Sequence, residues 1–351
     1  MYLPSSFTLP IDRLAGCFAN TTASYKFYWF LSLIQSVEHG KKRISRRELY
    51  ARMVANAWYS VNYFKLSLGK QDSLAKIIET IRYTEGVNQK EEMEKIVSQL
   101  TSNDIQISTI RQLETLGNNV PFYFLSTWVG SLKNIKEYIS ASQSFDNQCP
   151  YAIFDTYIEI DGEWFDYIFQ HSGILKDFCR WNLSLYLQSK NPNTPAIMDK
   201  LNFNPNDKRN QLTKQKGEFW NIALKQLGSI NCIYTHTSLS IGTYALDHFI
   251  PHSFVSHDLI WNLVPADPSF NSKKSNKIPE LNRYFDSFFD LQLKAYKIVV
   301  NSNTKNKFLE DYLTIFPNLD FHNMEEPNYD AFRNILQPLV TIARNNGFQT
   351  L

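Results

Sequence analysis

Hydrophobic residues recur at helical spacing through most of the chain, and this pattern predicts a mainly helical protein. Residues 21–38 are apolar on nearly all sides, which is typical of a buried helix. In residues 46–66, Leu49, Met53 and Ala57 fall on one helical face. Further helices are predicted at residues 72–83, 90–100, 105–116, 175–188, 206–227, 281–300, 304–315 and 328–345.

Alternation of apolar and polar residues predicts one β-hairpin among these helices, at residues 152–168. The pair Asp161-Gly162 lies between two short apolar runs, and Asp-Gly suits the type I′ turn that joins two strands. After the helix that follows, the polar, proline-containing residues 190–195 are the best candidate for a linker between domains.

A second pair of strands is predicted at residues 243–246 and 259–264. A short helix follows this pair. Asp267 is suited to cap the helix N-terminus, and Pro268 fits its first position, where a missing N–H is harmless. Asn271 falls in the first turns of this helix, and Pro279 is expected to end it.

Reactive side chains are concentrated in this stretch. If the helix packs back across the strands, the Asp247 carboxylate and the Asn271 amide oxygen can share one cation, and such hard oxygen ligands favour Mg²⁺ or Mn²⁺. Adjacent strand residues point to opposite faces, so His248 is directed away from Asp247. An imidazole there can take a proton from water as the water attacks a phosphorus atom.

The motifs DHFIP (247–251), WNLVP (261–265) and NSKKS (271–275) resemble the ββα-metal motif of HNH endonucleases. They are similar to stand-alone bacterial HNH proteins and to the HNH domain of RNA-guided nucleases. The resemblance covers about a tenth of the chain. It implies the following roles: Asp247 and Asn271 as metal ligands, His248 as general base, Asn262 as the residue that orients the site, and Lys274 as a contact to the scissile phosphate. Asn at the last ligand position, in place of His, argues against zinc or nickel.

The net charge of +2 is modest, so any surface that contacts nucleic acid must be local. Residues 200–285 hold ten Lys and Arg against six Asp and Glu, and Lys273 and Lys277 lie beside the motif. A second cluster precedes and enters the helix that begins at the capping box Ser45–Glu48. This basic cluster consists of Lys41, Lys42, Arg43, Arg46 and Arg47. Positive charge in a first helical turn opposes the helix dipole, so the cluster either faces phosphate or is a solvated surface.

Composition excludes several other classes of protein. A chain with 43% hydrophobic and 15% aromatic residues is not disordered. Its N-terminus does not resemble a signal peptide, and the apolar run 27–31 is too short to span a bilayer, so a soluble cytoplasmic protein without a membrane partner is expected. The four cysteines are widely separated and form no CxxC pair, which argues against a disulfide framework and a zinc knuckle.

Together these patterns predict a mainly α protein with an embedded ββα-metal nuclease module. The expected domains are a helical domain with one hairpin at 1–195, the nuclease module at 196–285, and C-terminal helices at 286–351 that pack on the module. The expected activity is Mg²⁺- or Mn²⁺-dependent hydrolysis of DNA, and analogy places it in restriction or anti-phage defence. An inactive nucleic-acid-binding or assembly subunit and an RNase are the alternatives. A partner protein or a homo-oligomer also stays open, because two-strand cutting needs two sites or two successive nicks.

Overall fold

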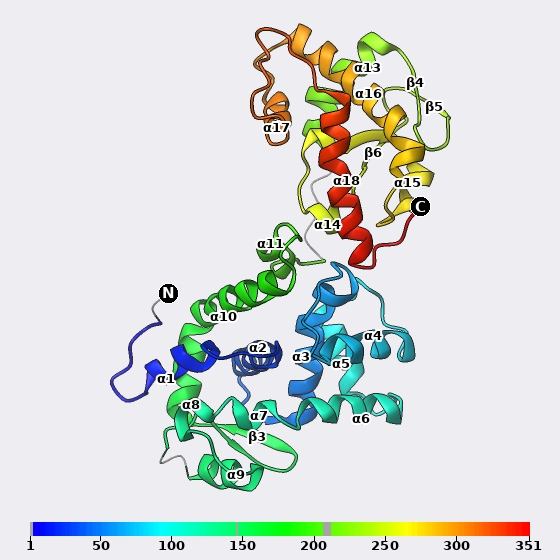
Figure 1. The fold of residues 1–351 in the computed structure, drawn as a ribbon. Coiled ribbons are helices and arrows are strands. Elements are labelled where there is room, and N and C mark those ends of the chain that lie inside the picture. Colours follow the sequence, from blue (N-terminus) through cyan, green and yellow to red (C-terminus); the bar gives the residue numbers. More distant parts are fainter. Residues whose placement is uncertain (1–2, 145–146, 206–211) are drawn as a thin grey trace. The chain divides into compact units, whose positions relative to one another are not determined.

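The computed structural model describes residues 3–144, 147–205 and 212–351. The chain forms two units (Figure 1). Unit 1 comprises Met1–Pro192 and Ile197–Asn206, and unit 2 comprises Asn193–Ala196 and Asp207–Leu351. Both units are mostly helical with small sheets, which confirms the predicted helical class. Within the described ranges, no helix is both long and apolar enough to cross a bilayer.

Unit 1 combines helices with one small sheet. Its helical elements are α1 (Ile11–Ala15), η1 (Gly16–Phe18), α2 (Tyr25–Glu38), α3 (Arg46–Asn62), α4 (Leu74–Thr84), α5 (Met93–Thr101), α6 (Ile107–Leu116), α7 (Val120–Tyr123), α8 (Ser126–Val129), α9 (Ile135–Gln143), α10 (Gly162–Lys190) and α11 (Ile197–Leu201). Strands β1 (Arg43–Ser45), β3 (Tyr157–Ile160) and β2 (Tyr151–Ile153) form an antiparallel sheet in that order.

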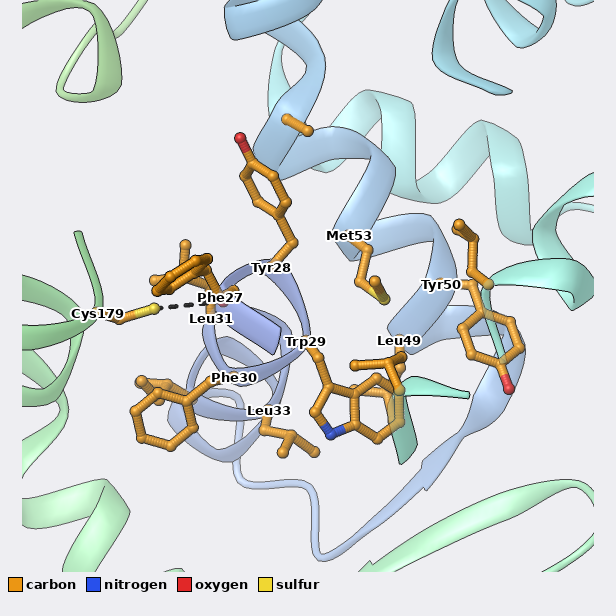
Figure 2. Close-up of a cluster of buried hydrophobic side chains, with 14 of the residues drawn as sticks. Phe27, Tyr28, Trp29, Phe30, Leu31, Leu33, Leu49, Tyr50, Met53 and Cys179 are labelled. Carbon is orange, nitrogen blue, oxygen red and sulfur yellow. Dashed lines mark hydrogen bonds between the residues drawn. The ribbon is translucent and has the colours of Figure 1, made fainter. Parts of the chain in front are cut away.

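Helix α2 is the centre of unit 1, and α3 and α10 pack against it. Its side chains are buried on all sides, as the sequence predicts (Figure 2). The Trp29 ring lies 6.4 Å, between centroids, from the ring of Tyr50 of α3, and its indole N–H donates to the Tyr151 hydroxyl over 3.0 Å. On another side of α2, the Cys179 thiol of α10 donates to the Phe27 carbonyl over 3.3 Å. Burial of these aromatic side chains supplies much of the hydrophobic stabilisation of unit 1.

The hairpin predicted at residues 152–168 is wrong in its turn and in its second strand. A hairpin does form, but between Tyr151–Ile153 and Tyr157–Ile160, and residues 162–168 belong to helix α10. Strands β2 and β3 pair with Ile153 opposite Ile158, so the chain reverses between those residues. Asp161 is the N-cap of α10 instead, and its carboxylate accepts from the backbone N–H groups of Glu163 and Trp164. Asp is favoured at both kinds of site, because its short carboxylate bonds to nearby backbone N–H groups in a turn or at a helix start. Here it begins the longest helix of unit 1.

Unit 2 contains the stretch that resembles a nuclease motif. Its helical elements are α12 (Thr213–Gln215), a π-helical segment η2 (Lys216–Trp220), α13 (Asn221–Leu227), α14 (His252–Val255), η3 (Ile260–Asn262), α15 (Pro268–Lys274), α16 (Leu281–Ser302), η4 (Lys307–Leu309), α17 (Glu310–Leu313) and α18 (Tyr329–Asn345). Strand β4 (Ile230–Asn231) pairs with β5 (Ser238–Leu239), and β6 (Ala245–His248) pairs with β7 (Leu263–Ala266).

Several predicted bounds in unit 2 shift in the structure. The first strand begins two residues later than predicted, and residues 260–262 form a 3₁₀ turn before β7. Helix α15 begins after its cap Asp267 as predicted, but it ends at Lys274 and not at Pro279. The first residues of the helix predicted at 206–227, with the predicted basic residues Lys208 and Arg209, lie outside the described residues.

All four cysteines are buried free thiols. Cys17, Cys149 and Cys179 belong to unit 1, and Cys232 belongs to unit 2. Burial raises the pKa of the Cys149 thiol to about 11 and raises the pKa of the Cys17 and Cys179 thiols as well. In unit 2, the Cys232 sulfur accepts a long hydrogen bond from the backbone N–H of Asp267, at 3.4 Å.

Candidate active site

Strand β6 positions Asp247 and His248 as direct neighbours. Asp247 lies opposite Val264 of β7, and His248 lies opposite Leu263. Both side chains are almost fully buried, with 3% of Asp247 and 7% of His248 exposed. Because adjacent strand residues project to opposite faces, the two side chains enter different surroundings and contact different groups.

The Asp247 carboxylate is held by two buried side chains. Its Oδ2 accepts from the Tyr234 hydroxyl at 2.7 Å, and its Oδ1 lies 3.0 Å from the ammonium Nζ of Lys274. Burial and the neighbouring Asp247 charge raise the pKa of the Tyr234 phenol, so this hydroxyl stays protonated and donates. Lys274 also donates to the His248 carbonyl at 2.7 Å. The Lys274 side chain has no exposed surface, so Asp247 and Lys274 form a buried ion pair.

The His248 imidazole meets a carboxylate on the other side of the strand. Its Nε2 lies 2.8 Å from Oδ1 of Asp258, which comes ten residues later in the loop between α14 and β7. The same Asp258 oxygen lies 3.9 Å from Nε2 of His252. A carboxylate bonded to one ring nitrogen determines which nitrogen carries the proton and therefore which one can act as a base.

Asn262 is fully buried and holds the backbone that follows His248. Its Oδ1 accepts from the Ile250 N–H, and its Nδ2 donates to the Ile250 carbonyl, each over 2.8 Å. The Asn262 carbonyl also accepts from the N–H of Phe249 at 2.8 Å. These three bonds satisfy both polar atoms of a buried amide and connect the end of β6 to the residue before β7.

Helix α15 packs against β6 and brings Asn271 and Lys274 to the site. Asp267 starts the helix by accepting from the Phe270 N–H at 2.8 Å, and Pro268 occupies its first turn. Asn271 is half-buried, and its Nδ2 lies 3.5 Å from the Leu246 carbonyl. Lys273 and Lys277 are exposed near the end of the helix.

The C-terminal elements of unit 2 support the loop between α14 and β7. The Asp311 carboxylate of α17 accepts from the Ile260 N–H at 2.8 Å, and burial raises the pKa of this carboxyl group. Gln292 of α16 donates to the carbonyls of Ile260 and Leu263, at 3.1 and 2.6 Å. Trp261 donates to the Thr314 hydroxyl at 3.0 Å. The site therefore depends on residues well beyond the predicted motif.

The structure brings together five predicted site residues: Asp247, His248, Asn262, Asn271 and Lys274. Lys274 differs from its prediction, because its ammonium group is buried against Asp247 and the backbone instead of being presented to a phosphate. Tyr234 and Asp258 contact the site but did not stand out in the sequence. Tyrosine is a common core residue, and Asp258 follows His257 in a segment that resembles an exposed polar loop.

The predicted basic cluster lies in unit 1, where its members have intramolecular partners. Lys41 pairs with Glu48 at 2.8 Å, Arg43 pairs with Glu159 at 3.2 Å, and Lys42 lies over the Phe165 ring. Arg46 donates to the Tyr50 hydroxyl and the Asp155 carbonyl, and Arg47 donates to the carbonyls of Leu100 and Ser102. Ser45 caps α3 by accepting from the Glu48 N–H, as predicted. A role in binding nucleic acid stays a prediction.

The side chains of the site suit one kind of metal ion. Among the described residues, there is no group of three or more His, Cys, Asp and Glu that could hold a metal. An ionised carboxylate has about four acceptor positions, and the two hydrogen-bonded oxygens of Asp247 leave part of that capacity for a cation. Asn271 donates through nitrogen, so its amide oxygen is the atom able to bind metal. This oxygen set fits Mg²⁺ or Mn²⁺ that retains waters, and it does not fit a four-ligand zinc centre.

In a comparison with known protein families, the segment that carries this site matches a family model. Residues 232–280 match the family described as HNH endonuclease. The matched segment contains the five predicted site residues and also Tyr234 and Asp258. No curated protein and no solved structure matches the chain.

Proposed function

Starting from the HNH-family domain at residues 232–280, we propose that this chain is a metal-dependent endonuclease that hydrolyses phosphodiester bonds in DNA. In this proposal β6, β7 and α15 form the ββα-metal module. One observation carries the proposal. Asp247 and His248 lie side by side on β6, and α15 places Asn271 and Lys274 against the same strand.

His248 is the general base in this mechanism. Its imidazole takes a proton from water as the water attacks phosphorus, and Asn262 fixes the backbone that follows the imidazole. Asp247 and Asn271 would hold Mg²⁺ or Mn²⁺. When bound, the ion stabilises the charge that develops on the phosphate and on the departing oxygen. Lys274 holds one oxygen of the Asp247 carboxylate in place, and Tyr234 holds the other.

DNA is the substrate that the resemblance to HNH endonucleases implies. The exposed Lys273 and Lys277 lie at the end of α15, where they can attract a phosphate backbone. A role in restriction or anti-phage defence is proposed by analogy with stand-alone bacterial HNH proteins. Cutting both strands would then need a second copy, a partner protein or two successive nicks.

The test is nicking of supercoiled plasmid by the purified chain with Mg²⁺, with Mn²⁺ and with EDTA. We expect relaxed plasmid with either metal and none with EDTA. His248→Ala should still fold and bind DNA but cleave at least about a hundredfold more slowly, which leaves a residual rate that single-turnover assays can measure. A single-stranded RNA of matched length measures the preference for DNA. Binding of DNA without cleavage under all metal conditions would favour an inactive binding subunit, and faster cleavage of the RNA would favour an RNase.

A further inference from the structure

We propose that Asp258 is a positioning residue that sets the tautomer of His248 for base catalysis. The proposal rests on the proposed nuclease function, in which His248 is the base. The two groups form a carboxylate-imidazole pair, with Asp258 Oδ1 2.8 Å from His248 Nε2. The pair is partly buried, with 8% of the His248 side chain and 23% of the Asp258 side chain exposed. A contact in such surroundings is stronger than one in open solvent.

The loop that carries Asp258 brings this residue back to His248 of β6. Helix α14 ends at Val255, and Ser256 then adopts a left-handed conformation with φ +58°, which is uncommon for a residue other than glycine. This residue reverses the chain after α14. Backbone contacts then hold the returning loop: Gln215 donates to the Asp258 carbonyl at 3.4 Å, and Asp311 accepts from the Ile260 N–H at 2.8 Å. The Asp258 backbone and the residues that follow it are therefore tied to Gln215 of α12 and to Asp311 of α17.

The pairing has a direct chemical consequence for His248. An ionised carboxylate only accepts hydrogen bonds, so the shared proton belongs to Nε2 of the ring. A neutral imidazole protonated at Nε2 carries its basic lone pair on Nδ1. When Nδ1 takes a proton from water, the ring becomes positively charged, and the Asp258 carboxylate stabilises that charge. His252, whose Nε2 is 3.9 Å from the same oxygen, lies beyond hydrogen-bond distance.

Asp258→Asn tests this role, because the change keeps the shape of the side chain and removes its charge. We expect the single-turnover cleavage rate at saturating DNA to fall at least about tenfold, while the dissociation constant for DNA changes less than about twofold. Asp290→Asn is the matched control. It makes the same change in unit 2 at an exposed residue paired with Lys294, and it should cut at the wild-type rate.

Combination with His248→Ala separates positioning from a general structural effect. If Asp258 acts through His248, adding Asp258→Asn to His248→Ala should not lower the residual cleavage rate further. The proposal would be overturned if Asp258→Asn lowered the cleavage rate of the His248→Ala variant by the same factor as it lowers the rate of the wild-type chain. Cleavage by the Asp258→Asn variant at the wild-type rate would also overturn the proposal, but it would leave the proposed nuclease function intact. A wild-type chain that cuts no nucleic acid would overturn both.

A spectroscopic measurement keeps the proposal testable if Asp258→Asn does not fold. In ¹⁵N-labelled wild-type protein, the ring nitrogens of His248 can be assigned by comparison with His248→Ala. We expect the neutral ring to carry its proton on Nε2. A ring that carries its proton on Nδ1 would overturn the proposal. Where Asp258→Asn does fold, its His248 ring should show a mixture of the two tautomers.

Discussion

Lys274 is buried, which is unusual for a lysine. Its ammonium group has no exposed surface and contacts Asp247 and a backbone carbonyl. Removing one partner of such a pair leaves the other as an uncompensated buried charge. We expect Lys274→Met to lower the free energy of unfolding of unit 2 by about 3–5 kcal/mol in urea titrations. The neighbouring exposed Lys273→Met should change it by less than about 0.5 kcal/mol. Equal stability of the two variants would contradict the ion pair.

Asp247 and Asn271 contribute unequally to the proposed metal site. Asp247 supplies a formal negative charge, whereas Asn271 supplies a neutral amide oxygen. We expect Asp247→Ala and Asn271→Ala each to raise the Mg²⁺ concentration that half-maximal cleavage requires, with the larger increase for Asp247→Ala. Cleavage rates measured across a Mg²⁺ series check this. An unchanged Mg²⁺ requirement in both variants would remove the proposed ligands.

At the scale of elements, the dipeptide Asp161-Gly162 is compatible with either a tight turn or the start of a helix. A type I′ turn would require positive φ at Gly162, whereas the helix start in the structure does not. A Cβ added at Gly162 would meet no atom within 4 Å. We therefore expect Gly162→Ala to stabilise unit 1 by about 0.4–1 kcal/mol, measured by thermal or urea unfolding.

Gly40 is the matched control for this substitution. A Cβ added there also meets nothing within 4 Å, but its φ is +75°. Gly40→Ala should therefore destabilise unit 1 by about 1–2 kcal/mol through backbone strain alone. Destabilisation of a similar size by Gly162→Ala would favour a tight turn at Asp161-Gly162.

Local patterns predicted several long helices well, but they missed the first part of α10 and most contacts of the site. Helices α3 and α18 follow from periodicity, and Ser45, which was predicted to cap α3, accepts from the Glu48 N–H. The strand pair followed from short apolar runs, and α15 followed from Asp267 and Pro268 at its start. The Tyr234 and Asp258 contacts were not predicted, because they span 13 and 10 residues and depend on how the loops fold back. Sequence spacing placed Lys274 near the site but could not reveal its burial.

At the scale of the whole molecule, the HNH-family segment shares its core with the C-terminal helices. The Phe249 ring stacks on Phe288 of α16 with 4.1 Å between centroids, and Gln292 bonds to both sides of η3. We expect residues 193–351 to unfold cooperatively as an isolated fragment, and residues 193–280 to lack a cooperative transition in circular-dichroism melts. A cooperative melt of the shorter fragment would show that the segment folds without α16 and α18.

Substitutions in the basic cluster can test whether unit 1 takes part in binding DNA. Arg46 and Arg47 are bonded to backbone carbonyls, so the sharpest variant replaces Lys41, Lys42 and Arg43 with Gln. If these residues bind phosphates, the variant should bind every DNA sequence more weakly. The slope of log K against log salt should also become shallower by about 0.9 for each phosphate that the variant no longer neutralises.

The double variant Lys133→Gln, Lys136→Gln is the control, because it removes exposed cations elsewhere in unit 1. We expect it to bind DNA as the wild type does, in affinity measurements on one short duplex over a range of salt. Unchanged affinity and slope in the Lys41, Lys42, Arg43 variant as well would assign DNA recognition to unit 2 or to a partner protein.

Each unit contains at least one buried cysteine whose rate of alkylation can report the opening of that unit. Three of the cysteines lie in unit 1, and Cys232 lies in unit 2 beside α15. A buried thiol reacts with an alkylating reagent only when its surroundings open, so the labelling rate of each cysteine follows the local opening free energy. Mass spectrometry of labelled peptides can therefore follow the opening of each unit within one intact sample. Alkylation of Cys232 would report whether DNA or Mg²⁺ changes the opening of unit 2, without any engineered probe.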